Sequence, residues 1–170
     1  MDKELSRILD ESIQLELNVA DLYLSFCHAF AEDKDFWSHL AEEEGNHAAL
    51  LRSGKLESLD EGQFPAKILA TNLDALIKAN KEIKELVKEH KQKPPSSRAS
   101  AFEIAIKVEE STGEIDFSCF MEQQADSPAL KLLRRVDRDD RDHARRIRNY
   151  MREKGIGIPG TINEGQDNVG

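Results

Sequence analysis

The chain has 170 residues, of which 39% are hydrophobic and 34% are charged, and its formal net charge is −9. A chain of this length fits one domain, and its hydrophobic share is too high for a disordered protein. The acidic balance argues against a nucleic-acid partner, because phosphate backbones are bound by clustered lysine and arginine.

The first dozen residues carry charges every few positions, where a signal peptide would need an uninterrupted apolar run. No later window reaches membrane-spanning length. We therefore expect no membrane partner and a cytoplasmic location.

The first two predicted helices follow from apolar residues that recur every three or four positions. The first covers about residues 3–31. Asp33 is a candidate cap for the second helix, Gly54 is expected to end it, and residues 54–64 are expected to form a loop. A third periodic stretch over about residues 65–90 is rich in lysine and glutamate, and we interpret it as a helical crossover connection.

Local signals predict two more helices. Paired prolines at 94–95 end the crossover stretch, and the serines that follow can cap a helix over about residues 98–124. Ser127-Pro128 is typical of the start of a last helix, which Gly155 ends in a left-handed conformation. Arginines in this last helix alternate with aspartates, and we interpret them as an ion-paired, solvated helix face.

These elements predict an all-α protein, a four-helix bundle with one long helical crossover between its second and third helices. The predicted bundle domain covers residues 1–155, and a loosely ordered, glycine-rich tail covers residues 156–170. Each half of the bundle carries a lone carboxylate followed by a carboxylate-x-x-His pair.

Six polar residues fall on the apolar faces of the predicted bundle helices: Glu16, Glu44, His47, Glu109, Asp140 and His143. Residues three apart share a helix face, so each carboxylate-x-x-His pair can present an oxygen and a nitrogen to one metal ion. Ionised groups are costly to bury unless they are paired or bound to metal. No lysine or arginine stands at these inward positions, whereas two divalent cations would balance four carboxylates. Mixed carboxylate and imidazole ligation favours iron, with manganese or zinc as alternatives, over calcium.

The glutamate of the third bundle helix is ambiguous, because Glu109 and Glu110 are adjacent. The spacing after Ile106 favours Glu109, and the spacing before Phe117 favours Glu110. Glu109 is preferred, and Glu110 remains the alternative. Tyr23 and Tyr150 each follow a predicted ligand by two helical turns, so either could hydrogen-bond to a ligand or carry a radical, or simply pack in the core.

The segments LELNVADLY, AEEEGNHAAL, IKVEESTGEIDF and DRDDRDHARRI resemble the four metal-binding helices of the ferritin-like superfamily, especially rubrerythrin-type proteins. The resemblance covers about residues 3–154. It implies that the two lone glutamates are terminal ligands, that the carboxylates of the two pairs bridge the metals, and that each histidine binds one metal.

The resemblance also implies a di-iron oxidoreductase that reduces hydrogen peroxide or oxidises Fe(II) with dioxygen or peroxide, and a homodimer. The rubredoxin domain of longer family members is missing, so a separate electron donor is expected. Asp140 replaces the usual glutamate, and Thr112 or Gly113 stands where rubrerythrins carry an extra glutamate. The alternatives are a non-catalytic metal-binding or storage module and a metal-free helical interaction protein.

Overall fold

The computed structural model describes residues 3–61, 73–114 and 142–157, and every regular element within these ranges is helical. The elements are α1 (Lys3–Ala29), the 3-10 turn η1 (Ala31–Asp33), α2 (Lys34–Glu61), α3 (Leu73–Gln92), α4 (Arg98–Glu114) and a helix over residues 142–153. The all-α prediction is confirmed for this part of the chain. None of the helices described has the length and apolar character needed to cross a bilayer.

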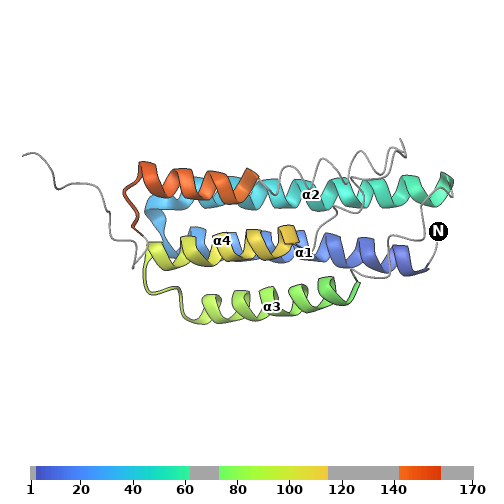
Figure 1. Ribbon diagram of the computed structural model, residues 1–170, viewed down its shortest axis with the longest axis horizontal. Helices are drawn as coiled ribbons and strands as arrows, with labels where there is room; N and C mark the ends of the chain where they lie inside the picture. Colours follow the sequence, from blue (N-terminus) through green and yellow to red (C-terminus); the bar gives the residue numbers. More distant parts are fainter. Residues whose placement is uncertain (1–2, 62–72, 115–141, 158–170) are drawn as a thin grey trace, which may run out of the picture.

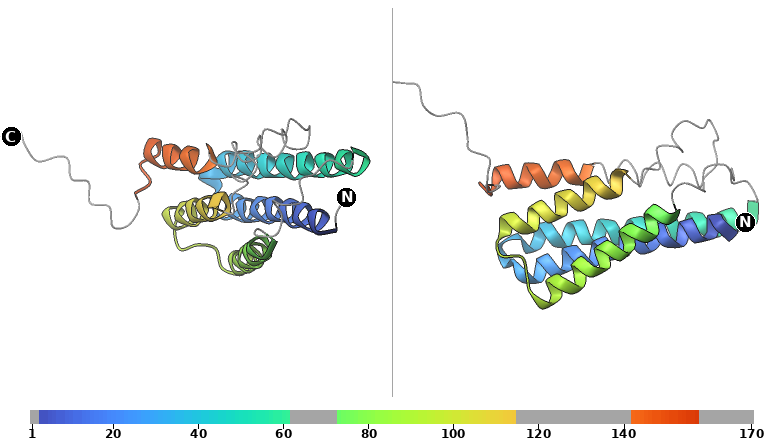
Figure 2. Two further views of the ribbon diagram at one scale, coloured as in Figure 1. Left: turned by 45° about the vertical axis from the view of Figure 1, so that its right-hand side comes forward. Right: turned by 60° about the horizontal axis from the view of Figure 1, so that its bottom comes forward.

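α1 and α2 form a long antiparallel hairpin joined by η1 (Figure 1). α1 packs mainly against α2 and α3, so α3 lies on the side of α1 that faces away from α2. α4 and the helix over residues 142–153 lie along the turn end of the hairpin, as Figure 2 also shows. The start signal predicted at Ser127-Pro128 lies outside the residues described.

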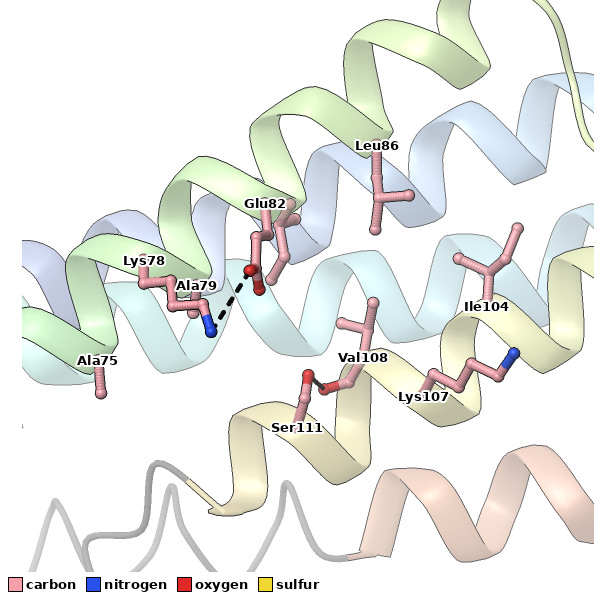
Figure 3. Close-up of a pocket in the computed structure, with 10 residues that line it drawn as sticks. Ala75, Lys78, Ala79, Glu82, Leu86, Ile104, Lys107, Val108 and Ser111 are labelled. Carbon is pink, nitrogen blue, oxygen red and sulfur yellow. Dashed lines mark hydrogen bonds and ion pairs between the residues drawn. The ribbon is translucent and has the colours of Figure 1, made fainter.

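The crossover stretch contains α3, which presents an apolar face to the core through Leu76, Ala79, Ile83 and Val87. Asn80, at the middle of that face, is buried and accepts a hydrogen bond of 2.6 Å from Asn18 Nδ2 on α1. A groove of about 450 Å³ separates α3 from α4 (Figure 3). α3 therefore packs mainly on α1 and makes few contacts with α4.

The prediction that Gly54 ends the second helix was wrong, because α2 continues through Gly54 to Glu61. A glycine inside a helix costs only about 1 kcal/mol relative to alanine. The residue after it, Lys55, reaches across to α1, where its Nζ lies 2.5 Å from Asp10 Oδ1 and 3.5 Å from the carbonyl oxygen of Ser6. Packing along α1 outweighs the local stop signal.

Two predicted helix ends are confirmed. Ser97 caps α4, since its Oγ accepts a hydrogen bond of 3.1 Å from the backbone N–H of Ser100. Gly155 has a φ of 62°. Its N–H donates to the carbonyl of Arg152 and the N–H of Ile156 donates to the carbonyl of Met151, which together form a Schellman end.

Candidate metal centre

Five of the six predicted ligands come together in the interior. Their relative exposures lie between 1% and 6%, and they come from α1, α2, α4 and the helix over residues 142–153: Glu16, Glu44, His47, Glu109 and His143. The sixth, Asp140, lies outside the residues described. Each of the five interrupts an apolar face, as the helical period predicted.

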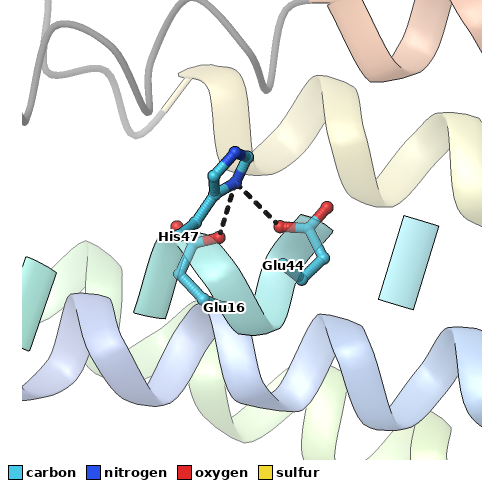
Figure 4. Close-up of side chains that lie close together, drawn as sticks. All are labelled: Glu16, Glu44 and His47. Carbon is cyan, nitrogen blue, oxygen red and sulfur yellow. Dashed lines mark ion pairs between the residues drawn. The ribbon is translucent and has the colours of Figure 1, made fainter. Parts of the chain in front are cut away.

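The first group of potential ligands consists of Glu16, Glu44 and His47 (Figure 4). His47 Nδ1 lies 3.6 Å from Glu16 Oε2 and 3.4 Å from Glu44 Oε2. Glu44 and His47 are three residues apart on α2, which puts both side chains on the face that meets α1. One imidazole nitrogen therefore faces two carboxylates.

The second group consists of Glu44, Glu109 and His143. His143 Nδ1 lies 2.8 Å from Glu44 Oε1 and 3.6 Å from Glu109 Oε1. Glu44 thus belongs to both groups, with one oxygen toward each histidine. The two imidazole rings are nearly parallel, and their centroids are 5.5 Å apart.

The geometry of both groups suits a metal ion. Glu44 Oε1 and His143 Nδ1 are buried atoms that have no hydrogen-bond partner of acceptable geometry, although they lie 2.8 Å apart. Metal–ligand bonds of about 2.1 Å place neighbouring ligand atoms about 3 Å from each other. In each group the potential ligand atoms all lie within 4.8 Å of one another. A cation between them would satisfy atoms that the protein leaves without a hydrogen bond.

Glu109 and Glu110 have different surroundings. Glu109 is buried and accepts a hydrogen bond from the hydroxyl of Tyr23. Glu110 is exposed and forms an ion pair with Arg148. The structure therefore brings Glu109 into the cluster and leaves Glu110 on the surface. Of the alternatives for the two tyrosines, Tyr23 hydrogen-bonds to a candidate ligand, whereas Tyr150 donates its hydrogen bond to Asp33.

Sequence reasoning did not find Glu43 and Arg146. His143 Nε2 lies 3.2 Å from Glu43 Oε2, and Arg146 Nη1 donates a hydrogen bond of 2.6 Å to the same oxygen. Metal-binding imidazoles usually direct their second nitrogen to a carboxylate in this way, which fixes the ring. These two residues, together with both histidines, line a polar opening of about 340 Å³. The only signal in the sequence was the position of Glu43 beside Glu44.

The cluster shifts the pKa values of two of its members. Burial, together with the neighbouring charge of Glu44, raises the pKa of Glu16 to about 8, although His47 opposes the shift. Burial disfavours the charged form of His143, but the carboxylates of Glu109 and Glu44 outweigh it and raise its pKa to about 11. At neutral pH the metal-free cluster therefore holds protons that a cation must displace.

The stabilisation that a bound metal gives is expected to grow as the pH rises from about 6 to about 9. Glu16 and His143 have raised pKa values in the folded chain, so their contribution to stability is present at low pH and is lost as the pH rises toward those values. The loss is about 1.4 kcal/mol per pH unit for each proton held only by the folded state. A bound metal ion displaces these protons, so the metal-loaded protein does not lose this stability as the pH rises.

Melting temperatures measured with metal and with chelator across this pH range test the expectation. The difference between the two should increase with pH. A variant of the exposed Glu110, Glu110→Gln, should behave as the unaltered chain does. If the difference in melting temperature became smaller with rising pH, the raised pKa values of Glu16 and His143 would be contradicted.

No protein-family model, curated protein or solved structure matches this chain. The described fold and site alone define its class: an all-helical protein with a buried cluster of glutamates and histidines that could bind metal.

Proposed function

We propose that this protein is a di-iron oxidoreductase of the ferritin-like, rubrerythrin type, which reduces hydrogen peroxide or oxidises Fe(II) with dioxygen or peroxide. The observation that carries the proposal is the position of Glu44, whose two oxygens face two separate ligand groups. A carboxylate in that position can bridge a pair of metal ions.

The composition of each group supports the choice of metal and of chemistry. Each holds two carboxylates and one imidazole, a set that suits iron and leaves coordination positions for a small oxidant. When bound, iron supplies the one-electron redox chemistry. The remaining ligand, by the family resemblance, is Asp140.

The chain's own residues hold these groups in place. Glu43, itself paired with Arg146, orients the imidazole of His143, and Tyr23 orients the carboxylate of Glu109. Trp37 and other fully buried apolar residues form the shell at the turn end of the hairpin. The polar opening beside the histidines is large enough to admit a molecule the size of hydrogen peroxide.

Anaerobic titration with Fe(II), followed by mixing with peroxide, tests the proposal. We expect binding to saturate at two ions per chain, one for each group, and the bound iron to be oxidised within seconds. Saturation at two ions without oxidation would support the non-catalytic storage alternative. Absence of any binding would overturn both the metal site and the function.

A further inference from the structure

Aromatic rings form a continuous series from the cluster toward the surface. The ring of Tyr23 lies 5.6 Å from that of Trp37, measured between centroids. Trp37 lies 4.4 Å from Phe102 and 5.3 Å from Phe36. Phe36 stacks on Tyr150 at 4.0 Å. Trp37 is fully buried, whereas Tyr150 is only partly buried, so the series reaches solvent at Tyr150.

Both ends of the series are hydrogen-bonded to carboxylates. At the inner end the Tyr23 hydroxyl donates to Glu109 in the cluster. At the outer end the Tyr150 hydroxyl donates to Asp33 Oδ1 at 3.0 Å. Arg98 holds the Asp33 carboxylate through two hydrogen bonds, of 2.6 and 2.7 Å. Each tyrosine therefore has a fixed proton acceptor.

We propose that Trp37 and Tyr150 form an electron-transfer chain that carries single electrons from a donor at the surface to the cluster. Its role in supplying electrons rests on the proposed function, for which a separate electron donor is expected. Tryptophan and tyrosine can be oxidised by one electron and reduced again, whereas the phenylalanines between them serve as packing that holds the rings in contact.

The steps balance in electrons and protons. With iron held by the cluster, Trp37 would give one electron inward and keep its indole proton, and so become a radical cation. Tyr150 then gives one electron to Trp37 and its phenolic proton to Asp33, which becomes a neutral carboxyl group. A one-electron reductant at the surface gives an electron to the Tyr150 radical, and Asp33 returns the proton. The net result is one electron moved from the reductant to the cluster.

The surroundings of Tyr150 fit this role. Burial and the hydrogen bond to Asp33 raise the pKa of Tyr150 to about 12, so the phenol keeps its proton at neutral pH until it is oxidised. Arg98, bonded to both Asp33 oxygens, keeps that carboxylate in place as the acceptor.

The composition of the chain makes the proposal directly testable, since it holds one tryptophan and two tyrosines. Laser photoionisation of metal-free protein, at the red edge of the absorption band where only tryptophan absorbs, produces the Trp37 radical. In the Tyr23→Phe variant, Tyr150 is the sole tyrosine. We expect the tryptophanyl signal to convert to a tyrosyl signal at a rate independent of protein concentration.

Two further variants complete the test. In Tyr23→Phe/Tyr150→Phe the rings and their packing stay, and the tyrosyl signal should disappear. In Tyr23→Phe/Asp33→Asn the conversion should slow, because the proton acceptor is lost. If the Trp37 radical of the Tyr23→Phe variant decays without any tyrosyl signal, the proposal is overturned. The measurement needs no metal, so its failure is distinct from a failure of the proposed function.

Discussion

Replacing Glu44 with alanine is expected to remove both metal ions from the protein. Glu44 is 2% exposed and supplies one oxygen to each ligand group, so no other side chain in the part of the chain described contributes to both. Among the described residues, its loss leaves one carboxylate and one histidine in each group, fewer than the three protein ligands that usually hold an ion. Elemental analysis of the two proteins, purified in parallel, should show that the metal content falls from two ions per chain to almost none.

The matched control for this change is Glu110→Ala. Glu110 is also a helical glutamate, on α4, but it is exposed and pairs with Arg148. The metal content of the Glu110→Ala variant should equal that of the unaltered chain. Retention of both ions by the Glu44→Ala variant would disprove the shared ligand, and loss of metal in the Glu110→Ala variant would show that the assay reports general disruption.

Replacing Arg98 with methionine is expected to lower the free energy of unfolding by about 3 to 5 kcal/mol. The side chain of Asp33 is fully buried, and Arg98 is the cation that neutralises it, from the first turn of α4. Without Arg98, the buried carboxylate keeps, among the described residues, only the hydrogen bond from Tyr150. Denaturant unfolding followed by circular dichroism measures the loss.

Two companion variants separate this buried charge from ordinary surface pairing. Lys91→Met breaks the exposed pair with Asp21, in which the two side chains are 57% and 55% exposed, and should cost less than about 1 kcal/mol. Arg98→Met/Asp33→Asn removes both charges and should recover part of the lost stability. Equal effects for Arg98→Met and Lys91→Met would contradict the buried pair.

Helix ends could be predicted from the sequence where the signal is local. Ser97 and Gly155 act through hydrogen bonds within a few residues, and both behave as predicted. Gly54 does not, because its effect competes with contacts from another helix, above all those of Lys55 with α1. Short-range patterns carry no information about such contacts.

The candidate metal site shows the same contrast between local sequence signals and contacts across helices. The apolar period placed Glu16, Glu44 and His143 in the interior, because each lies on a face that must be buried. It could not separate Glu109 from Glu110, which differ by one position on a helix. Contacts across helices distinguish them, because Glu109 meets Tyr23 and His143 whereas Glu110 meets Arg148.

The Asp33–Arg98 pair was missed for a related reason. Asp33 looked like a helix cap, and nothing local indicates that its carboxylate binds a residue on α4. Charged residues are frequent in this chain, and the sequence does not say which of them meet across helices.

The hairpin of α1 and α2 gives the site an order of assembly. Glu16, Glu44 and His47 all belong to two helices joined by a short turn, so their group needs only contacts that are close along the chain. Such contacts form early in folding, whereas those that close long loops form later. Glu109 and His143 arrive from helices synthesised afterwards. A nascent chain would thus present half of the cluster to metal before the other half exists, and the late helices would complete and enclose it.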